Sequence, residues 1–69
     1  MFDKKRFKAQ MVLKGVTGRA IAEALNINES TFYRKVNADG DFTRRDIKFL
    51  IEYLDIERPE EIFFAKELA

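Results

Sequence analysis

The chain has 69 residues, of which 46% are hydrophobic and 7 are Phe, and it carries a net charge of +1 at pH 7. It contains neither Cys nor His, which excludes disulfides, Cys- or His-ligated metals and the commonest general base. Hydrophobic packing within one small domain, residues 1–69, must therefore supply the stability, and no metal or cofactor is expected.

The charges are distributed unevenly along the chain. Residues 1–48 hold 11 Lys and Arg against 6 Asp and Glu, a net of +5, whereas residues 49–69 hold 2 against 6, a net of −4. Such a chain can present one basic side to phosphate, although ordinary solvated charge accounts for the same numbers.

No apolar run approaches the ~20 residues that a bilayer span needs. The charged start, residues 1–8, is not followed by the apolar core of a signal peptide. We therefore expect a cytoplasmic protein with no membrane partner.

The first predicted helix covers about Lys4–Lys14. Gly15 is expected to end it as a C-cap, because glycine adopts positive φ without steric cost. One face of this helix is apolar at helical spacing and is expected to point inward. It consists of Phe7 and Met11, extended by either Val12 or Leu13.

The second predicted helix covers about Gly18–Leu25, with Thr17 as its N-cap. Asn26 is expected to end it, because Asn is the residue other than Gly that most readily turns left-handed. Its inward stripe follows the i, i+1, i+4 spacing. The residues of this stripe are Ile21, Ala22 and Leu25.

The third predicted helix covers about Glu29–Val36, behind Asn28 as its N-cap. Glu29 lies favourably at the positive end of the helix dipole. Phe32 and Val36 are four residues apart and are expected to point inward together.

Residues 37–41 form a turn by composition. Thr43 then opens a fourth helix, and Asp46 three residues later completes a capping-box pattern. This helix runs to about Leu54 and has four inward positions. They are Ile47, Leu50, Ile51 and Leu54.

A fifth helix is predicted to begin within Arg58–Glu61, where proline occupies the first helical position and acidic residues fill the first turn. Ile62 and Phe63, with Leu68 as a further candidate, remain to be buried. Since no segment alternates with period two long enough to form a strand, the sequence predicts an all-α domain of five helices.

The second and third helices are joined by only three residues, Asn26-Ile27-Asn28, so they must cross steeply and pack closely. Ala22 is small enough to permit that crossing, and Ile27 can plug the corner from inside. Phe32 anchors the third helix to the core. These features define a helix-turn-helix over about Thr17–Asn37.

These residues resemble the helix-turn-helix of the lambda-repressor-like, Cro-type (XRE) family. Gly15-Val16-Thr17 looks like the lead-in to that family's second helix, and Ser30–Asn37 looks like the recognition helix of its small phage repressors. Ile47–Ile56 is similar to its fourth helix, so the resemblance covers about Phe7–Phe63. It implies a compact lambda-repressor-like DNA-binding domain and sequence-specific binding to double-stranded DNA, as in a small phage or prophage transcriptional repressor.

The chain departs from the family pattern at three positions. The family often has Gln at the position of Gly18, where the side chain bonds phosphate, but here only the backbone N–H is available. Asn26 replaces the usual glycine and can adopt the same left-handed conformation. Glu29 places an acid at the front of the recognition helix, where it repels phosphate but can accept a hydrogen bond from cytosine N4.

If the third helix lies in the major groove, its outward side chains reach the base edges. The predicted base-contacting residues are Asn28, Glu29, Ser30, Tyr33, Arg34 and Asn37. The predicted phosphate-contacting residues are Thr17, Gly18, Arg19, Thr31, Lys35, Arg44 and Arg45. For Arg34, a fork onto guanine O6 and N7 and a contact to phosphate both remain open.

Two functions other than DNA binding are also compatible with parts of the sequence. A small helical bundle without a nucleic-acid role needs the tight corner but not the many hydrogen-bond donors of the third helix. A protein-interaction module, antitoxin-like or anti-repressor, would use the tail, residues 62–69, where the adjacent Phe63 and Phe64 cannot both face one core. The same tail is a candidate homodimer contact, because two copies on half-sites about one DNA turn apart double the contacts to DNA.

The basic cluster Lys4–Lys8 either touches phosphate or forms the solvated face of the first helix. No enzyme activity is expected, because the sequence shows neither a nucleophile with a paired base nor a Gly-rich phosphate loop. No small-molecule ligand is expected either, because the chain leaves no room for a ligand-sensing domain beside the DNA-binding one.

Overall fold

The computed structural model describes residues 1–65, which form five helices and no strand. The helices are α1 (Lys4–Lys14), α2 (Gly18–Leu25), α3 (Glu29–Asn37), α4 (Arg44–Tyr53) and α5 (Pro59–Phe63). The predicted all-α architecture of five helices is thereby confirmed. The expected burial of Leu68 and the tail beyond Ala65 lie outside the described residues.

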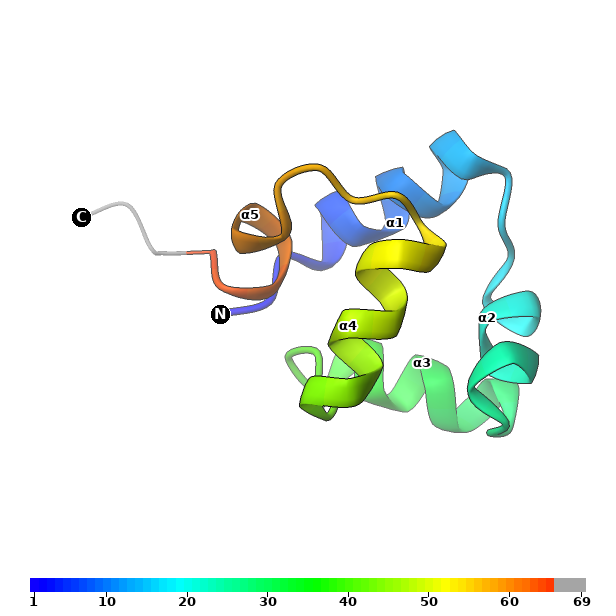
Figure 1. The fold of residues 1–69 in the computed structure, drawn as a ribbon. Helices are drawn as coiled ribbons and strands as arrows, with labels where there is room; N and C mark the ends of the chain where they lie inside the picture. The colour runs from blue at the N-terminus through cyan, green and yellow to red at the C-terminus, as the bar shows by residue number, and fades with distance from the viewer. Residues whose placement is uncertain (66–69) are drawn as a thin grey trace.

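The helices α2 and α5 lie at opposite ends of the molecule. Figure 1 shows α2 and α3 together at one end and α5 with the N-terminus at the other, while α4 lies between α1 and α3. α2 packs against α3, and α1 packs against α5. Within residues 1–65, no helix combines the length and the apolar composition that crossing a bilayer requires.

Two helices begin at the threonines that the sequence marks as N-caps. The side-chain oxygen of Thr17 accepts a hydrogen bond from the Ala20 N–H at 3.1 Å. Thr43 and Asp46 each accept a hydrogen bond from the backbone N–H of the other, at 3.1 and 3.3 Å, and so form the predicted capping box. These bonds satisfy backbone donors that the first turn of a helix leaves without partners.

The helix ends also agree with the sequence, to within one residue. Gly15 and Asn26 end α1 and α2 in the left-handed conformation, with φ of 64° and 59°. Asn28 occupies the N-cap position of α3, although its side chain makes no capping hydrogen bond. α3 extends through Asn37, and α4 ends at Tyr53.

Five phenylalanines form the centre of the core. The ring centroids of Phe2, Phe7, Phe32, Phe42 and Phe63 lie 5.3 to 6.2 Å from their neighbours. The predicted inward residues of the helices after α1 are buried or packed against this cluster. They are Ile21, Ala22, Leu25, Val36, Ile47, Leu50, Ile51, Leu54 and Ile62.

Phe2 was not among the expected core residues, yet it ties the N-terminus to two distant segments. Its side chain is buried, and its backbone N–H donates to Asp39 Oδ1 at 3.1 Å in the turn between α3 and α4. The next N–H, that of Asp3, donates to the Ile62 carbonyl at 2.7 Å. Gly40, with φ of +67°, lies directly against the ring, because a Cβ atom there would come within 2.5 Å of Phe2 Cδ1.

The expectation that Val12 or Leu13 extends the inward face of α1 is wrong. Phe7 and Met11 are buried, but Val12 is 80% exposed and Leu13 is 74% exposed. Each residue of a helix turns by about 100°, so these two side chains rotate away from the Phe7–Met11 line. The next position on that line falls at Lys14, where the helix ends.

Candidate nucleic-acid interface

A tight corner sets the position of α3 relative to α2. Asn26 turns left-handed, and the following Ile27 N–H donates to the Ala22 carbonyl at 2.9 Å. Ala22 is 2% exposed, and Ile27 packs against the core as the predicted plug. The small side chain at the crossing and the left-handed turn together let α3 begin only three residues after α2 ends.

The two faces of α3 have opposite character. Phe32 and Val36 are fully buried, which holds one face of this 9-residue helix against the core. The residues predicted to point outward are exposed, with one exception. The exposed ones are Asn28, Glu29, Ser30, Arg34 and Asn37.

The exception is Tyr33, which folds back onto the first turn of α2. It is half-buried, and its ring meets that of Phe32 edge-on, with centroids 5.2 Å apart. A Cβ atom at Gly18 would lie 2.5 Å from Tyr33 Cζ, so the ring occupies the space that any side chain at position 18 would need. The Tyr33 ring thus lies beside the start of α2, and a side chain at position 18 would have to displace it.

Three of the predicted phosphate-contacting residues lie at the start of α2, and a fourth lies on α3. Thr17 and Gly18 lie at the start of α2, where the backbone N–H groups give the helix its positive end. Arg19 is exposed and forms a loose ion pair with Glu23 at 3.5 Å. Thr31, on α3, is half-buried.

Some polar side chains at the far end of α3 are engaged within the fold. Lys35 Nζ donates to the Asp41 carbonyl at 3.4 Å. The side-chain oxygen of Asn37 accepts a hydrogen bond from Lys4 Nζ at 3.2 Å. The basic cluster at the start of α1 is therefore partly engaged in contacts within the molecule, and Phe7 inside it belongs to the core.

Arg44 and Arg45 occupy the first turn of α4, where the helix dipole favours anions and disfavours cations. Both are exposed, and no ion pair involves Arg34, Arg44 or Arg45 within residues 1–65. Two cations at this position therefore gain nothing from the helix dipole.

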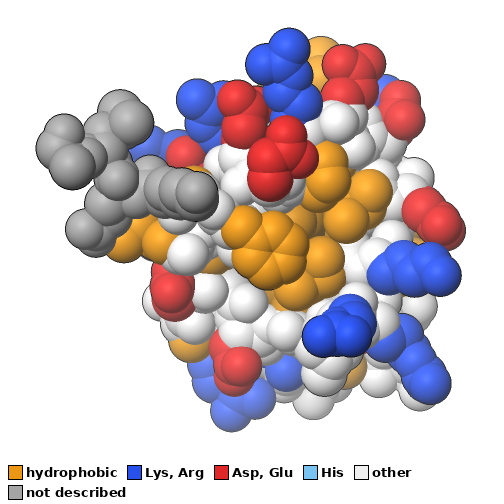
Figure 2. Space-filling model, turned by 60° about the vertical axis from the view of Figure 1, so that its left-hand side comes forward, with side chains coloured by type: hydrophobic (Ala, Val, Ile, Leu, Met, Phe, Trp, Pro, Cys, Tyr) orange, Lys and Arg blue, Asp and Glu red, His pale blue; other side chains and the backbone are white. Residues whose placement is uncertain are grey.

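A stacked pair of aromatic side chains on α4 was not predicted from the sequence. Phe49 and Tyr53 are four residues apart on α4, and their rings stack with centroids 5.2 Å apart. Tyr53 and Phe64 are 40% and 62% exposed, whereas Phe63 is buried, so the two adjacent phenylalanines do face different ways. Hydrophobic side chains gather in the middle of the face shown in Figure 2, ringed by charged side chains of both signs. The i, i+4 spacing of Phe49 and Tyr53 was the available signal.

Within residues 1–65, no group of three or more Asp, Glu, His or Cys side chains is arranged to hold a metal ion. Comparison of the chain with protein-family models, with curated proteins and with solved structures gives no match.

Proposed function

We propose that this chain binds double-stranded DNA by placing the outward face of α3 in the major groove. The observation that carries the proposal is the division of α3 into a fully buried face and an exposed polar face, directly after a left-handed corner from α2. The major groove admits an α-helix, and a helix held to its scaffold by buried side chains can present the others to base edges.

The polar side chains of α3 match the chemistry of base edges. Arg34 can donate two parallel hydrogen bonds to guanine O6 and N7, a pairing worth ~1–3 kcal/mol of discrimination. Ser30 can donate to or accept from either type of edge, and Glu29 can accept from cytosine N4. Because Tyr33 lies against Gly18, its hydroxyl is better placed for the sugar–phosphate backbone beside the start of α2 than for a base.

Contacts to phosphate would fix the register of α3 on the duplex. The N–H groups at the start of α2 and the guanidinium groups of Arg19, Arg44 and Arg45 are suited to this role. The resemblance to Cro-type repressors extends the proposal to a small cytoplasmic repressor of phage or prophage type, which blocks transcription by occupying its operator. Two copies on neighbouring half-sites would double the number of contacts.

The test is an NMR titration of labelled protein with a random-sequence duplex, at low salt and again at ~200 mM salt. We expect amide shifts at residues 17–20 and 28–37 that fade as salt rises, because counterion release drives phosphate contacts. Absence of shifts at both salt concentrations would contradict the proposal.

Arg34→Ala is expected to weaken binding to a selected operator by about 1–3 kcal/mol and to relax the preference at one base pair. Arg34→Lys keeps the charge but loses the planar fork, so it should lose preference more than affinity. Fluorescence anisotropy against operator variants measures both quantities. Lys8→Ala, on the exposed face of α1, is the matched loss of one charge. An equal effect of Lys8→Ala and Arg34→Ala would show that Arg34 supplies only general charge.

A protein-interaction module is the second candidate, favoured by the exposure of Phe64 beside the buried Phe63. An antitoxin-like or anti-repressor partner would cover this side chain. Binding to such a partner through apolar contacts would change little with salt, whereas binding to DNA would weaken steeply.

A further inference from the structure

α1, α5 and the loop before α5 enclose an open groove of about 560 Å³ on the side of α1 that carries Leu13. Its apolar lining consists of Ala9, Leu13, Ile56 and Ile62. Ile56 and Ile62 form a buried floor, whereas Leu13 projects from the edge and is 74% exposed. A single surface therefore carries both a projecting apolar side chain and an apolar hollow beside it.

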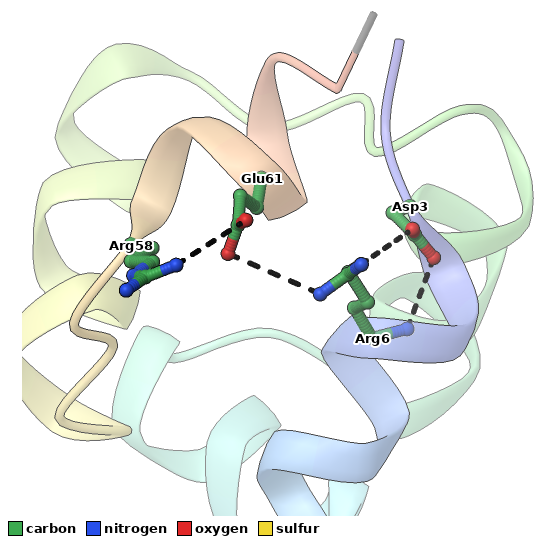
Figure 3. Close-up of polar contacts among 4 residues, drawn as sticks. All are labelled: Asp3, Arg6, Arg58 and Glu61. Atoms are coloured by element: carbon green, nitrogen blue, oxygen red, sulfur yellow. Dashed lines mark hydrogen bonds and ion pairs between the residues drawn. The ribbon is translucent and has the colours of Figure 1, made fainter. Parts of the chain in front are cut away.

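Charges of both signs border the hollow in equal number. Arg6 and Arg58 lie on its rim together with Glu57 and Glu61. Figure 3 shows that Glu61 lies between the two arginines, and its ion pairs with Arg6 and Arg58 are long, at 3.9 and 3.8 Å. Glu57 is exposed and forms no ion pair within residues 1–65.

We propose that this groove is the interface through which two copies of the chain form a two-fold dimer, with Leu13 of each copy seated in the hollow of the other. An interface of this symmetry presents the same patch on both subunits, so it must complement itself in shape and in charge. The groove is suited to both, because the projecting Leu13 borders the hollow and the rim carries two positive and two negative side chains. A nucleic acid or a strongly charged peptide would require a rim with an excess of one sign of charge. This rim has two positive and two negative side chains and therefore no such excess.

The pairing rests on the groove alone and does not require the proposed DNA binding. It assigns the dimer contact to α1 and α5, in place of the exposed Phe64 or the α4 aromatic pair. Loose ion pairs such as those of Glu61 can exchange partners across the two-fold axis at little cost, because exposed pairs contribute little to stability.

The test needs no DNA, so its failure and that of DNA binding are distinguishable. Sedimentation equilibrium from micromolar to millimolar protein should show a monomer–dimer equilibrium. Leu13→Lys should raise the dimer dissociation constant at least about tenfold, because the contact is lost twice in each dimer. Val12→Lys is the matched control, since Val12 is 80% exposed on the same helix but does not line the groove. Both variants should keep the melting temperature of the diluted wild-type protein.

A mixture of labelled and unlabelled chains gives an independent readout. Isotope-filtered NOE spectra should connect the Leu13 methyl groups of one copy with the Ile56 and Ile62 methyl groups of the other. The proposal is overturned if the chain stays monomeric at millimolar concentration. It is equally overturned if Tyr53→Lys or Phe64→Lys abolishes the dimer while Leu13→Lys does not.

Discussion

Gly40→Ala is expected to lower the free energy of unfolding by about 2–4 kcal/mol. Two costs add at this position. The left-handed backbone, with φ of +67°, disfavours any Cβ by about 1–2 kcal/mol. The new methyl group would also collide with the buried ring of Phe2, whose Cδ1 would lie 2.5 Å away. Urea unfolding followed by circular dichroism measures the loss.

Gly15→Ala is the matched control for this substitution. Gly15 has a nearly equal φ of +64°, but a Cβ atom there would meet nothing within 4 Å. Its loss should therefore be only about 1–2 kcal/mol, the backbone cost alone. In a Phe2→Ala background the extra cost of Gly40→Ala should disappear. Equal losses for the two glycines in the wild-type background would mean that Phe2 does not lie over the turn between α3 and α4.

Ala22→Leu is expected to remove a large share of the protein's free energy of unfolding, about 3 kcal/mol. Ala22 is 2% exposed, and its carbonyl accepts the Ile27 N–H that closes the corner. A larger side chain there must push α2 and α3 apart, and overpacking of a close crossing costs about 3 kcal/mol or more. A domain of this size has a total stability of only about 3–10 kcal/mol. Circular dichroism and thermal unfolding report the loss directly.

Ala24→Leu serves as the control on the same helix. Ala24 is exposed, and Leu is nearly as good a helix former as Ala, so its effect should stay within about 0.5 kcal/mol. If Ala22→Leu keeps the melting temperature of the wild type, the described packing of α2 on α3 is incorrect.

The helix positions could be predicted from the sequence because the signals that set them are local. Thr17, Thr43 and Gly15 act through hydrogen bonds and backbone conformations that span only a few residues, so the sequence nearby is sufficient to predict them. The buried residues of α2 and α3 were also predictable, because the apolar positions of a helix with known ends define its inward face.

Contacts between distant segments could not be predicted in this way. Phe2 precedes the first helix, so no periodicity marks it as inward, and its partners Asp39 and Ile62 lie far along the chain. The prediction for Val12 and Leu13 was wrong because apolar character alone does not imply burial. α1 buries only a narrow line of side chains, and the apolar residues beside that line remain exposed.

Within the candidate interface, the exposure of the α3 side chains was predictable, but their contacts with other helices were not. Arg34 and Ser30 lie on the exposed face that the helical spacing implies. Tyr33 does not project freely, because Gly18 leaves an empty space on α2 into which its ring packs. Asn37 is bonded to Lys4 from another helix, a contact between residues too far apart in sequence for local rules to reveal.

The ring of Tyr33 over Gly18 makes these two positions a linked pair in evolution and in protein engineering. A lineage that acquires a larger residue at position 18 must either move the Tyr33 ring or replace it with a smaller side chain. Gly18→Gln introduced alone would displace the ring, whereas the double change with Tyr33→Ala would have room for both side chains. Under the proposed DNA binding, the first turn of α2 would therefore meet phosphate through its backbone N–H groups, the Arg19 guanidinium and the Tyr33 hydroxyl supplied by α3.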